Sequence, residues 1–231
     1  MASTPNPDAR RPLRGLYAVT SAAMCADSTR LLASSEAALC GGARLLEYRD
    51  KQNERAVQQR LAPVLANLCR HFGATLIIDH DLDLALACGA GGVHLGSGDA
   101  SVADARRALG PQAIIGATAG TDLELAQAAQ AAGADYVSFG RFFASRTKPN
   151  APVAPLELLV QARTVLQVSI CAIGGVRLDN GAGLIAAGAD LLGSVEGVFD
   201  HGDAAGVERT ARAYVNLFTP DSQAIPPTAL S

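Results

Sequence analysis

The sequence predicts a single (β/α)8 TIM barrel with a parallel eight-stranded core. Short apolar runs suited to strands alternate with longer amphipathic runs along the chain, the order that parallel βαβ units produce. The length of 231 residues suits one such barrel. A Gly-Ala pattern also recurs before alternate strands. A doubly wound open sheet would show the same alternation, but the number and regularity of the units favour the closed barrel.

The expected strands are short segments in which apolar residues dominate. They occupy 15–20, 44–48, 75–79, 92–95, 113–117, 135–139, 168–172 and 190–194. Between them lie helical patterns, and in 55–72 the apolar residues recur at spacings of three and four, at Val57, Leu61, Val64, Leu65 and Leu68. Further helices are expected at 101–109, 122–132, 156–166 and 179–187.

The internal repeat supports this arrangement. Four segments share a Gly, then an Ala, then a short apolar strand, and they are 41–48, 88–95, 131–139 and 186–194. In each, the Gly can take the left-handed conformation that ends a helix, and the following residues enter a strand. The copies fall on the second, fourth, sixth and eighth strands, so each interval holds two βα units.

The ends of the chain differ from the expected barrel, which spans 13–218. The segments 1–12 and 219–231 contain prolines and are expected to be loose tails. The first of them has no apolar stretch of the kind that a signal peptide needs. No apolar run approaches the roughly 20 residues of a membrane span.

Composition narrows the classes of partner. The formal net charge of −3 predicts no basic surface for nucleic acid or for an anionic membrane. The 5 cysteines are scattered and form no CxxC pair, which predicts reduced, buried thiols in a cytoplasmic protein. The oligomeric state stays open, a homo-oligomer included.

Polar segments follow the expected strands, at the end of the barrel where such folds build their sites. They are 47–51, 79–81, 96–99, 118–120, 140–149, 173–176 and 194–197. Barrels frequently bind phosphate after strands seven and eight, through backbone N–H groups. Gly174 and Gly175 follow the seventh strand, where they would let the backbone approach an anion. The alternative is a simple tight turn.

Three cations are placed to meet at this end of the barrel. Arg49 and Lys51 alternate at a strand end, so we expect them to point the same way, into the mouth. Lys148 follows the sixth strand. Together they would neutralise a diphosphate, whereas each one separately could be a solvated surface charge.

The candidate metal ligands follow the third and fourth strands. They are Asp79, His80, Asp81 and Asp99. Carboxylates at neighbouring strand ends suit Mg²⁺, which takes oxygen ligands and bridges to substrate phosphates. The alternative is helix capping, which we favour for Asp81. His94, inside a strand, is expected to be a hydrogen-bonded histidine of the barrel interior.

The ordered series of motifs resembles the thiamine-phosphate synthase family from about residue 13 to 217. The series consists of Gly15-Leu16-Tyr17-Ala18-Val19-Thr20, the Tyr-Arg-Asp-Lys of 48–51, Gly92-Val93-His94-Leu95-Gly96 with Asp99, Ile115-Gly116-Ala117-Thr118, the segment 136–149, Ala172-Ile173-Gly174-Gly175 and Gly188-Ala189-Asp190. Its members fall in order at strand ends, which makes the series more specific than any one motif.

The resemblance implies a reaction and a set of roles. The enzyme would join 4-amino-2-methyl-5-pyrimidinylmethyl diphosphate to hydroxyethylthiazole phosphate and release diphosphate, through a pyrimidinylmethyl cation. The implied catalytic residues are Arg49, Lys51 and Lys148, with Mg²⁺ as cofactor. The pyrimidine diphosphate would be bound by these three with Glu47, Tyr48, Asp50, Asp79 and Thr118. The thiazole phosphate would be bound by Ser145, Arg146, Thr147, Gly175, Val195 and Glu196. The metal would be held by Asp99, with His80 at a family ligand position and Asp79 as a substitute.

Several residues depart from the family pattern. Glu47 stands where Gln is usual, Asp79-His80 where Asn-Asp is usual, and Glu196 where a small polar residue is usual; Ser97 and Gly120 also differ. A carboxylate cannot donate a hydrogen bond and repels a diphosphate. Imidazole is also a poor ligand for a hard cation.

These departures leave other functions open beside the synthase. One is a non-catalytic or repurposed relative that binds thiamine phosphate or thiazole phosphate. A second is the thiazole tautomerase-like branch, which would lose the cations. A third is a phosphate-sugar isomerase, in which Glu47 would be the base.

Overall fold

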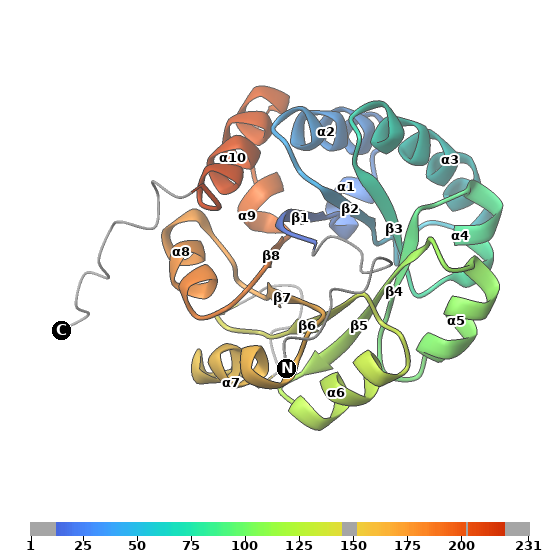
Figure 1. The fold of residues 1–231 in the computed structure, drawn as a ribbon. Helices are drawn as coiled ribbons and strands as arrows, with labels where there is room; N and C mark the ends of the chain where they lie inside the picture. The colour runs from blue at the N-terminus through green and yellow to red at the C-terminus, as the bar shows by residue number, and fades with distance from the viewer. Residues whose placement is uncertain (1–12, 145–151, 202, 220–231) are drawn as a thin grey trace.

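The computed structural model describes residues 13–144, 152–201 and 203–219 as a closed eight-stranded barrel ringed by helices (Figure 1). Each strand pairs in parallel with the next, and β8 pairs with β1. The strands are β1 Gly15–Val19, β2 Leu45–Tyr48, β3 Thr75–Asp79, β4 Gly92–Leu95, β5 Ile114–Gly120, β6 Tyr136–Phe139, β7 Ser169–Ile173 and β8 Leu191–Ser194. The predicted fold class is confirmed.

The helices form the outer ring that the amphipathic pattern predicts. They are α1 Ala22–Cys25, α2 Ser28–Cys40, α3 Arg55–His71, α4 Leu82–Cys88, α5 Val102–Leu109, α6 Leu123–Ala131, α7 Glu157–Val165, α8 Leu178–Ala186, α9 Glu196–Phe199 and α10 Ala204–Asn216. Figure 1 shows α10 beside α2, which closes the ring between the two ends of the chain. Of the two segments expected to be tails, only Thr219 lies within the described residues.

The core has two layers, because successive strand residues face opposite sides. Buried side chains that face outward pack against the helices. A second cluster fills the barrel interior and is formed by Tyr17, Val19, Leu45, Ile77, Tyr136, Cys171 and Leu191. This inner cluster supports the residues at the carboxyl ends of the strands, where the site is built.

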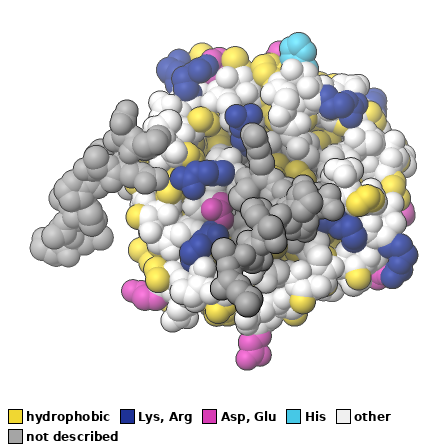
Figure 2. All heavy atoms as spheres, in the orientation of Figure 1, with side chains coloured by type: hydrophobic (Ala, Val, Ile, Leu, Met, Phe, Trp, Pro, Cys, Tyr) yellow, Lys and Arg dark blue, Asp and Glu magenta, His cyan; other side chains and the backbone are white. Residues whose placement is uncertain are grey.

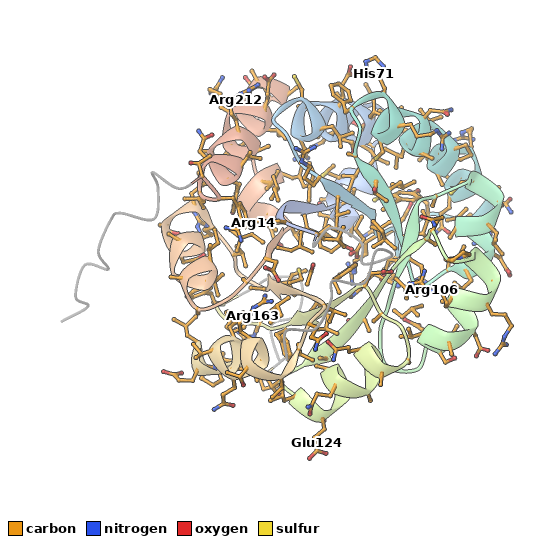
Figure 3. The ribbon with its side chains drawn as sticks, viewed as in Figure 1. Arg14, His71, Arg106, Glu124, Arg163 and Arg212 are labelled. Carbon is orange, nitrogen blue, oxygen red and sulfur yellow. The ribbon has the colours of Figure 1, made fainter. Side chains whose placement is uncertain are left out.

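Two of the four copies of the internal repeat contain an aspartate with a structural role that the sequence pattern did not reveal. In each of the two, the aspartate reaches back to the preceding strand and to an arginine of the helix that leads into that strand. Asp135 Oδ2 accepts from the backbone N–H of Ile115 at 2.7 Å and from Arg106 of α5 at 2.6 Å. Asp190 repeats the device with Ile170 and with Arg163 of α7. Figure 3 labels both arginines, which extend from the helices toward the strands.

Replacing Asp135 with alanine is expected to lower the free energy of unfolding by about 2 to 3 kcal/mol, because the buried N–H of Ile115 loses its charged acceptor. Urea denaturation followed by circular dichroism measures the change. The matched control is Glu208→Ala, which removes a carboxylate from the exposed ion pair with Arg212 and should leave the midpoint nearly unchanged. Equal midpoints for the two variants would contradict this role for Asp135.

The expectation that all the cysteines are buried is wrong for one of them. Cys25, Cys69, Cys88 and Cys171 are buried, but Cys40 is exposed at the end of α2. Burial raises the pKa of Cys25 to about 11 and that of Cys69 to about 12. A hydrogen bond with Glu208 raises the pKa of Cys40.

A thiol-specific disulfide reagent is therefore expected to modify only Cys40 in the native protein and all 5 thiols after denaturation. The reaction of Cys40 should accelerate as pH rises, because its raised pKa leaves little thiolate at neutral pH. Absorbance of the released reagent measures both quantities. Cys40→Ser is the control, and fast native reaction in this variant would show that a buried thiol becomes accessible.

None of the helices in the described part of the chain combines the length and apolar character needed to span a bilayer. On the face shown in Figure 2, the Lys and Arg side chains of the described residues are interspersed with hydrophobic and acidic ones. This mixed distribution agrees with the small formal net charge of −3.

Candidate active site

A cavity of about 420 Å³ lies at the carboxyl ends of the strands. All eight strands, or the loops that follow them, contribute to its lining. The predicted site residues among this lining are Glu47, Arg49, Asp79, Thr118, Gly175, Val195 and Glu196. The structure thus brings together in one cavity residues that the sequence placed at separate strand ends.

Asp79, at the end of β3, lies between two of the predicted cations. Its Oδ2 is 2.7 Å from Lys51 Nζ and 3.7 Å from Arg49 Nε. Lys51 Nζ also lies 2.7 Å from Nδ1 of His80, whose backbone is left-handed with φ of 57°. Arg49 lines the main cavity, whereas Lys51 and His80 line a smaller adjoining one that shares Asp79.

The prediction that Arg49 and Lys51 point the same way holds only in part. β2 ends at Tyr48, and Lys51 lies in the bend that follows the strand, where the two-residue alternation of a strand no longer applies. The two cations therefore converge on one carboxylate from two adjoining cavities. Lys148, the third cation, lies outside the described residues, as do Ser145, Arg146 and Thr147.

Tyr48 and Asp50 are placed away from the main cavity. Tyr48 is buried among the outward-facing residues of the core and donates to Asp50 Oδ2 at 2.8 Å. Asp50 Oδ1 accepts from the backbone N–H groups of Gln52 and Asn53. Burial alone would raise the pKa of Asp50, but hydrogen bonds from Asn53, Tyr48 and Gln52 hold it below its usual value. In this structure the two residues shape the loop that carries Lys51.

Glu47 lies at the floor of the cavity and is 4% exposed. The hydroxyl of Tyr17 donates to Glu47 Oε2 and lies 2.8 Å from the hydroxyl of Tyr136. Tyr136 is in turn 3.0 Å from His94 Nδ1, and His94 Nε2 is 2.9 Å from Thr118 Oγ1. Five side chains from five strands thus form one continuous hydrogen-bonded chain.

Both tyrosines stay protonated in this environment. Burial, followed by the charge of Glu47, raises the pKa of Tyr17 and of Tyr136 well above the usual value. The structure confirms the expectation that His94 is a hydrogen-bonded histidine of the barrel interior. His94 also lines the cavity, which the sequence did not indicate.

Sequence reasoning missed several residues that line the cavity. They are Tyr17, His94, Ser138, Arg141 and Arg177. Strand alternation could have found Tyr17, which lies two residues before Val19 on the same face of β1. No local pattern marks Arg177, which lies in the loop after β7 and is the N-cap of α8.

Gly174 and Gly175 form the wall after β7, with left-handed φ values of 94° and 71°. A Cβ on Gly175 would meet the backbone oxygen of Ala144 at 2.4 Å. Asn180 Nδ2 donates to the oxygen of Gly175 at 3.1 Å and holds the turn in place. The segment is therefore a tight turn that also lines the cavity, beside Val195 after β8. The tight turn is therefore confirmed, and phosphate binding by this Gly-Gly pair stays a prediction.

The predicted metal ligands do not form a preassembled cluster. Among residues 13–144, 152–201 and 203–219, no group of three or more His, Cys, Asp and Glu side chains could hold a metal ion. Asp99 is exposed, and its Oδ2 accepts from the N–H of Gly96 at 2.7 Å. Asp81 is the N-cap of α4 and accepts from Leu84 N, as expected.

The donor set nevertheless fits the usual protein environment of Mg²⁺. That ion is commonly held by one or two carboxylates, with waters and substrate phosphates completing its coordination. Asp79, the last residue of β3, and Asp99, in the loop after the neighbouring β4, supply two carboxylates. His80 could offer a metal ion only a ring nitrogen as ligand, and its Nδ1 is already in contact with Lys51.

Comparison with known proteins identifies relatives along most of the chain. A family model described as thiamine monophosphate synthase matches residues 16–198. A thiamine-phosphate synthase of Thioalkalivibrio sulfidiphilus (strain HL-EbGR7) is 50% identical over 206 residues, which cover 89% of this chain and 96% of that protein.

Solved structures agree with these matches. The thiamine phosphate pyrophosphorylase of Pyrococcus furiosus superposes with a TM-score of 0.77 at 28% identity, covering 88% of this chain and 94% of that one. The protein of the same name from Bacteroides thetaiotaomicron has a TM-score of 0.64 at 14% identity, covering 88% and 96%. The second likeness supports the fold alone.

Proposed function

Because the chain belongs to the thiamine monophosphate synthase family, we propose that its cavity joins 4-amino-2-methyl-5-pyrimidinylmethyl diphosphate to hydroxyethylthiazole phosphate. The products are thiamine phosphate and diphosphate, and the protein is a transferase. The observation that carries the proposal is a single cavity with three different walls. The first is a wall with Arg49, next to the smaller cavity that holds Lys51; the second is a wall with the Gly-Gly turn; the third is a floor of hydrogen-bonding side chains.

The reaction exchanges one bond for another at the methylene carbon of the pyrimidine. The bond from this carbon to the diphosphate oxygen breaks, and its electron pair leaves with diphosphate. The thiazole ring nitrogen then supplies the electron pair of the new C–N bond. Negative charge grows on the leaving diphosphate, so fixed cations lower the barrier. Arg49 lines the cavity and Lys51 lies beside it, and Lys148 is proposed to complete the set.

The floor is proposed to bind the aminopyrimidine ring. An ionised Glu47 carboxylate can only accept hydrogen bonds, and the 4-amino group of the pyrimidine can donate one to it. Thr118 lies at the other end of the same hydrogen-bonded chain and also lines the cavity. The buried floor excludes water beneath the ring, which protects a reactive cation from hydrolysis.

The wall after β7 and β8 is proposed to bind the phosphate of the thiazole substrate. Left-handed Gly175 lets backbone approach the anion, and Val195 lies beside it. Glu196 carries a negative charge at this wall, and Arg177 supplies a positive charge in the same lining that can offset it. Ser145, Arg146 and Thr147 are proposed to contact the thiazole substrate as well.

Mg²⁺ is proposed as the cofactor, held by Asp99 and by Asp79. When bound, it supplies positive charge to the oxygens of the diphosphate. In the structure Asp79 forms an ion pair with Lys51, so the carboxylate exchanges part of this contact when the ion binds. We also infer a cytoplasmic enzyme that acts on small phosphorylated substrates, with a homo-oligomer as an allowed state.

The direct test is to incubate the purified protein with both substrates and either Mg²⁺ or Mn²⁺. Thiamine phosphate is quantified after oxidation to fluorescent thiochrome, and Lys148→Ala serves as the comparison. We expect metal-dependent product that falls sharply in the variant. No product with either metal, from protein shown to be folded, would contradict the synthase and favour a binding protein whose site is changed at Glu47, Asp79 and His80.

A further inference from the structure

The hydrogen-bonded chain under the cavity has a direction. It runs from Glu47 through Tyr17 and Tyr136 to His94 and Thr118. Tyr17 is 1% exposed and Tyr136 is 0% exposed. Bulk water therefore does not compete for the bonds in the middle of the chain, and each hydroxyl has a single proton to give.

The direction follows from the carboxylate. Glu47 accepts, so the hydroxyl of Tyr17 donates its only proton to Glu47. The oxygen of Tyr17 must then accept from Tyr136, and the oxygen of Tyr136 must accept from Nδ1–H of His94. In neutral His94 the other nitrogen, Nε2, is then an acceptor. The hydroxyl of Thr118 donates to Nε2 at 2.9 Å, which leaves a lone pair of Thr118 Oγ1 for the cavity.

We propose that Tyr17 and Tyr136 are positioning residues that hold His94 in its Nδ1–H tautomer and thereby make Thr118 an acceptor toward the cavity. The two ends of the chain, Glu47 and Thr118, then both accept hydrogen bonds from a ligand. A pyrimidine with an amino group can donate hydrogen bonds to these acceptors. A pyrimidine with a carbonyl oxygen in the same place cannot, because the carbonyl oxygen is itself an acceptor. This consequence for the substrate rests on the proposed function, whereas the tautomer of His94 does not.

The tautomer is measured on the protein without any substrate. Protein with ¹⁵N-labelled histidine is studied by NMR at pH 8, where histidine is largely neutral. The two ring nitrogens differ strongly in shift according to which one carries the proton. The chain has 4 histidines, and loss of one set of signals in His94→Gln assigns that residue. We expect Nδ1–H for His94, and an Nε2–H tautomer would overturn the proposal directly.

Tyr17→Phe is the sharper variant, because Tyr17 bonds to Glu47 and Tyr136 and is linked to His94 through Tyr136. Without Tyr17 as acceptor, the hydroxyl of Tyr136 has His94 Nδ1 as its nearest acceptor, so His94 should switch to Nε2–H. Tyr136→Phe should cause the same switch. Tyr214→Phe is the matched control, because it removes another buried hydroxyl, bonded to Ser194 and Val176. An unchanged tautomer in folded Tyr17→Phe protein would contradict the chain.

A kinetic measurement then links the tautomer to the substrate. In Tyr17→Phe the KM for the pyrimidine diphosphate should rise about tenfold, equivalent to about 1.4 kcal/mol, with the KM for the thiazole phosphate unchanged. A switched tautomer with unchanged KM would confirm the chain and contradict its role in recognising the amino group. Absence of activity in the unsubstituted protein would contradict only the synthase, since the NMR result stands without it.

Discussion

Replacing Arg49 with alanine is expected to lower kcat/KM for the pyrimidine diphosphate by about 100- to 1000-fold. Arg49 lines the cavity, and its side chain is 24% exposed, so it would meet the proposed diphosphate in a partly desolvated place. Lys51 cannot replace it fully, because Asp79 holds the ammonium group at 2.7 Å. The rate of thiamine phosphate formation, measured as thiochrome at several substrate concentrations, tests this expectation.

Two variants separate the charge of Arg49 from its shape. Arg49→Lys keeps the positive charge but loses the planar guanidinium, so we expect a loss of about tenfold. Arg55→Ala removes an arginine that pairs with Asp81 on the surface, and its rate should stay within about twofold of the unsubstituted protein. A loss below about tenfold in Arg49→Ala would indicate that Lys51 and Lys148, and not Arg49, stabilise the diphosphate.

Replacing Gly175 with alanine is expected to raise the KM for the thiazole phosphate by about 100-fold, because the turn that is proposed to bind this phosphate must move. The new Cβ would lie 2.4 Å from the oxygen of Ala144 and 2.7 Å from Cβ of Phe143. The φ of 71° is also unfavourable for alanine. The KM for the pyrimidine diphosphate, which is proposed to bind at the wall with Arg49, should change little.

Stability and kinetics are to be measured together for this variant. We expect the free energy of unfolding of Gly175→Ala to fall by about 2 to 4 kcal/mol. The matched control is Gly183→Ala in α8, where a Cβ would meet no atom within 4 Å. That control should be unchanged or up to about 1 kcal/mol more stable. If Gly175→Ala keeps the KM of the unsubstituted protein, the thiazole phosphate does not bind at this turn.

The barrel could be predicted from the sequence because its causes are local. Helix and strand periodicity, and a Gly before alternate strands, depend on neighbours along the chain. The expected strands match the observed ones closely, except that β5 extends to Gly120 and its pairing shifts near Thr118. Regular βα alternation then leaves few ways to bury the strands.

The candidate site was only partly predictable. Polar residues and a Gly-Gly pair at the strand ends identified Glu47, Arg49, Asp79 and Gly175 as neighbours, and the cavity brings them together. Simple alternation would have separated Tyr48 from Glu47, because adjacent strand residues face opposite sides. Lys51 could not be placed, because it lies beyond the end of β2.

The sequence by itself determined the barrel, the end at which its cavity lies and the family to which the motifs point. Only the tertiary structure decided the partners of the buried polar groups. Tyr17 and Tyr136 are separated by 119 positions, yet their hydroxyls lie 2.8 Å apart. Likewise, Asp79 meets Lys51 through the curvature of a loop. Periodicity reports which side of an element a residue faces, whereas hydrogen bonds depend on how distant elements pack to within tenths of an ångström.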